Sequence, residues 1–222
     1  MLRLIHTADW QLGKPYRRFD SDVRVALSEA RFDAIDAVGK AAVEHGASHV
    51  LVAGDVFDTE GPEDRVIVQA VSRMQRYACT WWLLPGNHDF ARNSGLWDRV
   101  RTKGAANIRI VAEPVPRELE PGHWLLPAPL MHRHNLDDPT ALLDTMETPG
   151  ATLRIGLAQP LKRSPGGDAV ATPRIDHRHQ LCRSRPDHPL HLEISQILLA
   201  RTTNQIICCN CQMTQAMTQV VV

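Results

Sequence analysis

Carboxylate, amide and imidazole side chains follow three short apolar segments in the first half of the sequence. They are Asp9, Asp55 and the run Asn87-His88-Asp89. Hard divalent cations such as Mn²⁺ and Mg²⁺ prefer carboxylate and amide oxygens as ligands, and imidazole joins them for softer ions. A carboxylate such as Asp55 can bridge two cations about 3.5–4 Å apart, and such a pair can activate water and clamp a phosphoryl group. A neighbouring histidine can donate a proton. These residue types therefore indicate metal-dependent phosphoester chemistry.

The elements that must position these side chains alternate between strands and helices. Buried strands are predicted at residues 2–5, 49–53 and 80–84, because each is a short apolar run that leads into polar or Pro-Gly residues. Helices are predicted at 21–45 and 63–77, and further strands at 107–111, 124–126 and 152–158. This alternation is typical of an α/β fold.

The predicted helix over residues 21–45 has apolar side chains at helical spacing. Ser21 is suited to cap its N-terminus. The residues that we expect on its buried face are Val23, Leu27, Ala30, Ala34, Val38 and Ala41.

The three polar clusters all follow predicted strands. A single aspartate in this position is often a turn former or a helix cap. Ligands of open α/β sheets, however, bind at the carboxyl ends of the strands. Three clusters in the same register are therefore harder to explain as ordinary turns than as one converging site.

The sequence around these clusters resembles a known family. The motifs are His6-Thr7-Ala8-Asp9-Trp10-Gln11-Leu12-Gly13, Val52-Ala53-Gly54-Asp55-Val56-Phe57-Asp58 and Leu84-Pro85-Gly86-Asn87-His88-Asp89. They are similar to the first three motifs of the calcineurin-like metallophosphoesterase superfamily, and in particular of its SbcD-type DNA-repair exonucleases. The resemblance covers residues 1–158. It implies a four-layer α/β/β/α sandwich that is incomplete at its C-terminal side.

The resemblance also implies a role for each matching residue. Asp9 would bind the first of two divalent metal ions, most commonly Mn²⁺ with Mg²⁺ as the alternative, and Asp55 would bridge both ions. Asn87 would bind the second ion, and His88 would assist at the scissile phosphate. Asp89 would orient His88. The implied reaction is hydrolysis of DNA phosphodiester bonds by a metal-activated water, and the implied partner is an SMC-like ATPase.

Two positions depart from the family pattern. Gln11 stands where the first motif usually has a histidine, and its amide oxygen is a weaker metal ligand than imidazole. The strand at 152–158 runs into Gln159-Pro160, where the family has a metal-binding histidine followed by glycine. No later histidine motif of the family is recognisable, and His177-Arg178-His179 lies in Pro- and Arg-rich surroundings unlike a strand end.

The composition changes after residue 158. Every Phe, Trp and Tyr lies at or before Trp124, while Pro, Arg and His are frequent after Pro160. We expect residues 1–158 to be a truncated metallophosphoesterase domain and residues 159–222 to be a poorly ordered tail. One hypothesis for this tail is an out-of-frame or rearranged reading of the gene. Two functional alternatives therefore stay open: an inactive remnant, and a same-fold phosphoesterase acting on a small molecule or a phosphoprotein.

Charge and hydropathy limit the partners and the location. Lys plus Arg and Asp plus Glu number 25 each in 222 residues, so the sequence predicts no global positive field for nucleic acid. Lys14, Arg17 and Arg18 follow the first motif and could contact DNA phosphates, or simply form a solvated loop. The start of the chain lacks the apolar core of a signal peptide, and no segment is apolar enough to span a bilayer. We expect a cytoplasmic protein.

Overall fold

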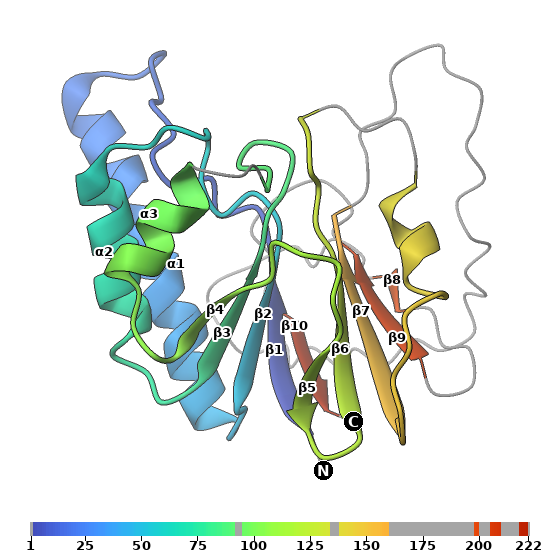
Figure 1. Cartoon of the computed structure of the whole chain (residues 1–222). Helices are drawn as coiled ribbons and strands as arrows, with labels where there is room; N and C mark the ends of the chain where they lie inside the picture. The colour runs from blue at the N-terminus through green and yellow to red at the C-terminus, as the bar shows by residue number, and fades with distance from the viewer. Residues whose placement is uncertain are drawn as a thin grey trace.

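Two sheets face each other in the computed structural model of the chain (Figure 1). The structure describes residues 2–91, 95–133 and 138–159, and the backbone of three further strand segments at 198–199, 205–209 and 218–221. The first sheet has the order β10-β1-β2-β3-β4 and the second the order β5-β6-β7-β9-β8. The strands of the first sheet are β1 Arg3–Thr7, β2 His49–Ala53, β3 Thr80–Leu84, β4 Ile108–Ile110 and β10 Thr218–Val221. Those of the second are β5 Arg117–Glu120, β6 His123–Ala128, β7 Leu153–Ala158, β8 Leu198–Leu199 and β9 Gln205–Cys209.

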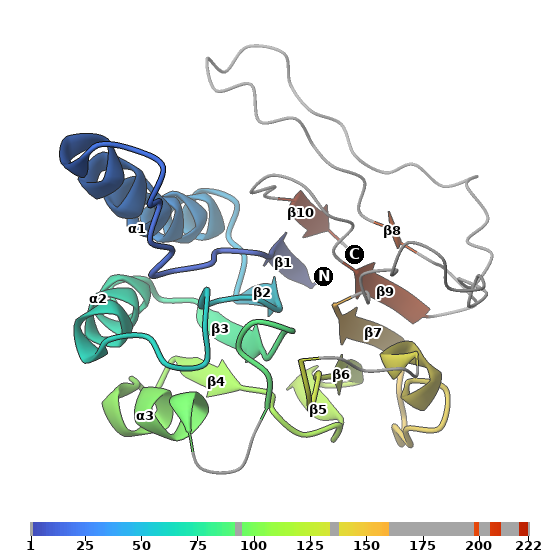
Figure 2. The same cartoon turned by 90° about the horizontal axis from the view of Figure 1, so that it is seen from above.

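Strands β1, β2, β3 and β4 pair in parallel, so their carboxyl ends lie at one edge of the sheet. The crossovers contain α1 Ser21–Glu44, α2 Asp64–Met74 and α3 Leu96–Lys103. All three helices cover the same face of the first sheet, as the view from above shows (Figure 2). A strand is found at each of the predicted positions, although β1 covers residues 3–7 rather than 2–5. Helix α3 and strands β5, β8, β9 and β10 were not predicted.

Two hydrophobic clusters hold these layers together. The first lies between the helices and the first sheet and includes Phe32, Ile35, Trp81 and Trp97. The second lies between the two sheets, where Leu4 and Leu51 meet Leu125, Ile155 and Leu157. Within the described residues, the outer face of the second sheet carries the short 3-10 helix η1 Pro139–Leu142. The α/β class and the paired sheets are therefore confirmed, with the outer layer on the C-terminal side incomplete in the described part.

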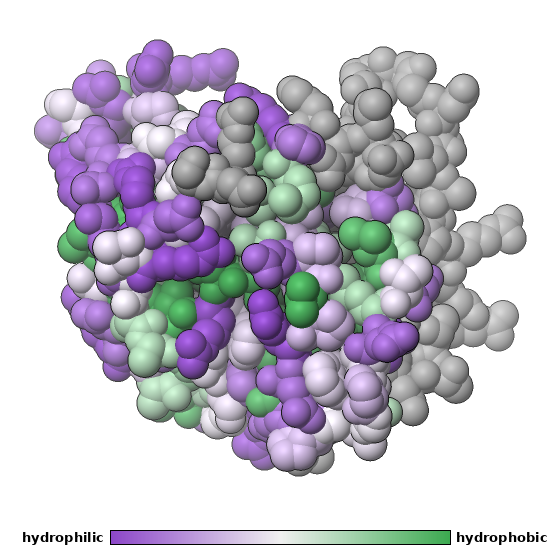
Figure 3. All heavy atoms as spheres, viewed as in Figure 1, coloured by the Kyte–Doolittle hydropathy of each residue, from purple (hydrophilic) through white to green (hydrophobic). Residues whose placement is uncertain are grey.

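The buried face of α1 differs from the predicted one. The buried residues are Phe32, Ile35, Val38, Gly39 and Ala42. Of the predicted face, Val38 is therefore buried and Ala41 packs against the core while partly exposed, whereas Leu27 and Ala34 are only half-buried. Val23 is 43% exposed, and Val25 is 70% exposed. The reason is that the first turns of α1 extend past the sheet, and only the second half of the helix contacts the core. Figure 3 shows the result on one face, where hydrophilic side chains dominate the helical side and the apolar patches are small.

Both tryptophans of β3 lie in the hydrophobic core. The side chains alternate between the faces of the strand, so Trp81 packs under the helices and Trp82 packs between the sheets. Each indole N–H has an acceptor: Trp81 donates to the carbonyl of Met74 (2.9 Å) and Trp82 to Nδ1 of His49 (3.2 Å).

Much of the predicted tail lies outside the described residues. This applies to Pro160, His177 and His179. The described backbone segments show β10 antiparallel to β1 and β9 parallel to β7. The division at residue 158 and the out-of-frame hypothesis stay predictions. Among the described residues, no helix is both long enough and apolar enough to cross a membrane.

His6 is a buried histidine on the face of β1 that looks toward the second sheet. It is 3% exposed, and no described residue gives either ring nitrogen a hydrogen-bond partner. Burial lowers the pKa of His6 to about 4. The folded state therefore holds this imidazole neutral, whereas the unfolded chain protonates it below about pH 6.5.

We expect His6 to make folding sensitive to acid. Between about pH 6.5 and pH 4 the unfolded state binds more protons at this position, so the free energy of unfolding falls as the pH falls, by up to about 3 kcal/mol. His6→Leu should remove this part of the dependence. The readout is the difference in unfolding free energy between the two proteins at each pH, from urea titrations. The exposed His45→Gln is the control. A wild-type-minus-His6→Leu difference that stays constant with pH would contradict the assignment.

Candidate metal and phosphoester site

The loops after β1 and β2 are joined by backbone hydrogen bonds that continue beyond the strands. The amide of Asp9 donates to the carbonyl of Gly54 (3.2 Å), and that of Gln11 donates to the carbonyl of Asp55 (2.8 Å). Leu12 then donates to Val56 (2.9 Å). These bonds place the first two predicted motifs side by side, as the parallel pairing required.

Three of the predicted site residues have left-handed backbone conformations. The φ angles are +54° at Asp9, +44° at Gln11 and +50° at Asp55. Tyr16 (+42°) is the fourth described residue other than glycine with positive φ. Such conformations cost about 1 kcal/mol or more each and persist where surrounding contacts impose them, most often at functional sites. These left-handed residues all lie in the loops after β1 and β2, at the edge of the sheet where the sequence motifs predict the site.

The loop after β3 joins the other two through Asp55. The backbone amide of His88 donates to Oδ1 of Asp55 (3.0 Å). Asp55 is 2% exposed, so this carboxylate is oriented by a neighbouring loop within the protein. The third motif thus lies against the second.

Asp89 has a structural position. Its two carboxylate oxygens accept from the amides of Gly86 (2.7 Å) and Phe57 (2.9 Å), which links the loops after β3 and β2. Burial raises the pKa of the Asp89 carboxyl to about 7, against the lowering effect of the Phe57 and Gly86 amides. The resemblance had implied that Asp89 orients His88, but both oxygens of this carboxylate bond to backbone amides of other residues.

His88 is oriented by a carbonyl instead. Its Nδ1 lies 2.9 Å from the carbonyl oxygen of Asp58. A carbonyl oxygen only accepts, so Nδ1 carries the proton of the neutral ring and Nε2 is the acceptor. His88 is partly exposed, and this leaves Nε2 as the nitrogen suited to exchange a proton with a ligand.

Gln11 and the basic residues lie at the rim. Lys14 donates from Nζ to Oε1 of Gln11 (2.7 Å), so the amide oxygen that could bind a metal is engaged by an ammonium group. Arg17 and Arg18 are exposed in the loop before α1.

Gln159 also belongs to the site, although its sequence context marked it only as a departure from the family pattern. It directly follows β7, is 5% exposed, and reaches across from the second sheet. Its Oε1 accepts from the backbone amide of Asn87 (2.9 Å), and its Nε2 lies 3.5 Å from Oδ1 of Asp9. The signal that could have identified it was its place at a strand end, the same criterion that selected Asp9 and Asp55.

Two facing sheets with carboxylates and amides at the carboxyl ends of the parallel strands define the class of this protein. Residues 2–147 match the calcineurin-like phosphoesterase family. The chain belongs to this family, and the sequence-based recognition is confirmed.

The relatives of the chain include a nuclease subunit and a DNA double-strand break repair protein. It is similar to the SbcD component of the nuclease SbcCD of Escherichia coli K12, with 26% identity over 197 residues that cover 85% of this chain and 44% of that protein. It is also similar to the DNA double-strand break repair protein Mre11 of Methanosarcina acetivorans, with 32% identity over 108 residues that cover 47% of this chain and 17% of that protein. The chain thus spans less than half the length of these relatives. The match to the SbcCD subunit covers 85% of this chain, which is more than residues 1–158 make up. This similarity therefore extends beyond residue 158.

Metallophosphoesterases bind divalent metals, and the donor set agrees with a hard cation. The converging loops carry two carboxylates, Asp9 and Asp55, and two carboxamides, Gln11 and Asn87. Oxygen-rich sets of this kind suit Mg²⁺ and Mn²⁺. Among the described residues there is no group of three or more His, Cys, Asp or Glu that could hold a metal ion.

Proposed function

We propose that this protein is a metal-dependent phosphodiesterase that hydrolyses DNA. The observation that carries the proposal is the hydrogen-bonded convergence of the loops after β1, β2 and β3, which gathers Asp9, Asp55, Asn87 and His88 at one edge of the first sheet. The DNA-repair relatives support DNA as the substrate.

In this proposal Asp9 and Gln11 would hold a first divalent ion, Asn87 would hold a second, and Asp55 would contribute its carboxylate to both. Mn²⁺ is the proposed ion, with Mg²⁺ as the alternative. When bound, the ions would supply a nucleophilic water and neutralise charge on the phosphate. The protein contributes the fixed direction of the Asp55 carboxylate, which the amide of His88 maintains.

His88 would act on the phosphate or on the leaving oxygen. The Asp58 carbonyl holds the ring by Nδ1, so Nε2 is the atom that can exchange a proton there. Asp89 would act indirectly, because its bonds to Gly86 and Phe57 hold the loop that carries His88.

The surroundings of the site complete the proposal. Lys14, Arg17 and Arg18 would contact DNA phosphates from the rim. An SMC-like ATPase partner and a cytoplasmic location are part of the proposal on the strength of the relatives and of the sequence. We also propose residues 1–158 as the phosphoesterase domain and residues 159–222 as an atypical tail, from which β10 pairs with β1 and β9 pairs with β7.

The test is nuclease activity on linear double-stranded DNA with Mn²⁺. We expect the full chain to cut, and His88→Ala to lower the rate by about a hundredfold or more, in line with the loss of a general acid–base group. The exposed His45→Ala is the matched control and should keep the wild-type rate. Omission of Mn²⁺, or addition of a chelator, should abolish cutting.

A second candidate is an inactive remnant that binds DNA without cutting it. Gln159 favours this candidate, because it occupies the strand end where the resemblance leads us to expect a metal-binding histidine. If the full chain and His88→Ala both fail to cut but retard labelled DNA equally, the remnant is favoured. If the full chain instead hydrolyses a small phosphodiester but not DNA, the substrate assignment is wrong and the phosphoesterase class stands.

A further inference from the structure

The side chain of Gln159 lies within the cluster of proposed metal ligands. Its carboxamide is buried and contacts two of the three loops: Oε1 accepts the Asn87 amide proton (2.9 Å), and Nε2 faces Oδ1 of Asp9 (3.5 Å). The residue comes from the second sheet, whereas the loops come from the first. Gln159 therefore joins the two sheets at this edge.

Two glycines make room for this carboxamide. A Cβ atom at Gly54 would lie 2.5 Å from Oε1 of Gln159, and one at Gly86 would lie 2.2 Å from the same oxygen. Real Cβ atoms do not approach an oxygen so closely. The loops after β2 and β3 thus form a cradle that the amide of Gln159 fills, and this cradle adjoins Oδ1 of Asp55.

The orientation of the carboxamide follows from its neighbours. An amide N–H can be met only by an acceptor, so Oε1 must face Asn87 and the NH₂ group must face Asp9. Turning the amide over would place two donors against each other. The edge of Gln159 that Asp9 meets is consequently a donor edge, and it cannot coordinate a cation that Asp9 also binds.

We propose that the Gln159 carboxamide is an internal occupant of the metal site, with its NH₂ group in the place of a cation beside Asp9. This rests on the site described under the proposed function and concerns its regulation. A divalent ion that binds Asp9 and Asp55 must displace Nε2 from Asp9. The apparent affinity for the ion is reduced by the fraction of molecules in the occupied state. Removing the carboxamide removes the competitor and leaves both carboxylates in place.

The test is Mn²⁺ and Mg²⁺ binding to the full chain by isothermal titration calorimetry, with Gln159→Ala as the variant. We expect binding to become about tenfold tighter, the scale of one lost hydrogen bond to a charged group. Gln69→Ala, which loses a glutamine amide on α2, is the control and should not change the affinity. The proposal would be overturned if Gln159→Ala bound the ion with equal or weaker affinity, or if neither protein bound Mn²⁺ at millimolar concentration. Weaker binding by Gln159→Ala would instead assign Gln159 as a metal ligand.

A second measurement on the wild-type chain covers the case in which Gln159→Ala does not fold. The side-chain NH₂ signals of Gln159, assigned by their loss in Gln159→Ser, should exchange with solvent faster when Mg²⁺ saturates the site. Unchanged exchange at saturation would contradict displacement. Neither readout depends on DNA cutting. A chain that binds metal as predicted but cuts no DNA would therefore refute the proposed function alone.

Discussion

Gly86→Ala should abolish divalent-metal binding and lower the free energy of unfolding by about 3 kcal/mol, at the upper end of what overpacking costs. The added Cβ would lie 2.3 Å from the backbone nitrogen of Asp55, 2.4 Å from its Oδ1 and 2.2 Å from Oε1 of Gln159. The Gln159 side chain could rotate away, but the Asp55 backbone cannot, because its carbonyl accepts from Gln11 (2.8 Å). Gly86 itself is held by Asp89 (2.7 Å).

Gly61→Ala provides the matched control for this substitution. No heavy atom lies within 4 Å of a Cβ at Gly61, so the same chemical change should leave both the unfolding midpoint and the metal affinity unaltered. Urea unfolding monitored by tryptophan fluorescence and calorimetric titration with Mn²⁺ provide the two readouts. A Gly86→Ala protein with the wild-type midpoint would show that the loop after β3 is looser than the contacts indicate.

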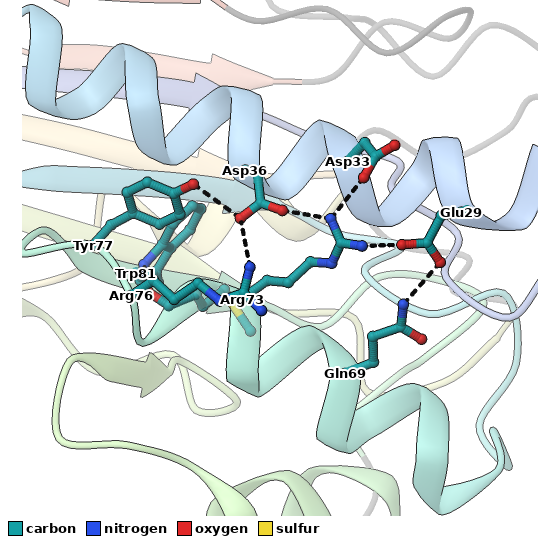
Figure 4. A network of polar contacts seen from close by, with 9 residues as sticks. Glu29, Asp33, Asp36, Gln69, Arg73, Arg76, Tyr77 and Trp81 are labelled. Carbon is teal, nitrogen blue, oxygen red and sulfur yellow. Dashed lines mark hydrogen bonds and ion pairs between the residues drawn. The ribbon is translucent and has the colours of Figure 1, made fainter.

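Arg73→Met should lower the free energy of unfolding by about 3 kcal/mol, because it leaves a group of carboxylates without their shared cation. The guanidinium of Arg73 on α2 pairs with Glu29, Asp33 and Asp36 of α1 (Figure 4). The Arg73 side chain is 12% exposed and that of Asp36 is 15% exposed, so solvent screens this pair weakly. Glu29 and Asp33 are at least half exposed and add less.

Two neighbouring side chains should limit the loss of stability in Arg73→Met without preventing it. Tyr77 donates its hydroxyl to Oδ1 of Asp36 (2.9 Å), and Arg76 lies 3.7 Å from the same carboxylate. Arg73→Lys should recover only part of the stability, because an ammonium group cannot pair with three carboxylates in the planar arrangement of a guanidinium.

The control for Arg73 comes from the same helix. Arg65 pairs with Glu63 at 2.7 Å, but both side chains are largely exposed, so Arg65→Met should leave the urea midpoint unchanged. Equal midpoints for Arg73→Met and Arg65→Met would mean that the α1–α2 contact depends on apolar packing alone. Both variants lose one charge and make the same substitution on α2, so the difference between them isolates the poorly exposed ion pairs of Arg73.

Much of the fold followed from local sequence. The segments at 49–53 and 80–84 are short apolar runs, and both are strands with these bounds. The strand ends selected Asp9, Asp55 and Asn87 as neighbours, because parallel strands with short loops bring their carboxyl ends to one edge. The motifs around them identified the family. Such features depend on residues close together in the chain, where apolar periodicity and turn chemistry are decisive.

The tertiary structure decided what depends on contacts between distant residues. The buried face of α1 shifted to Phe32 and Ile35, because only the part of the helix over the sheet can bury side chains. Asp89 bonds to the backbone of Phe57, 32 residues away, which no local pattern encodes.

In the candidate site, too, some features follow from the local sequence and others only from the tertiary structure. By itself the sequence determined which carboxylates and amides stand at the strand ends, and therefore the class of chemistry. Only the tertiary structure placed Gln159 among them, in contact with Asn87 at a separation of 72 residues and with Asp9 at 150. It also imposed left-handed conformations on Asp9, Gln11 and Asp55, which residues other than glycine seldom adopt by local preference. The physical reason is that the meeting of two sheets, rather than any single segment, determines the space between their edges and the side chain that fills it.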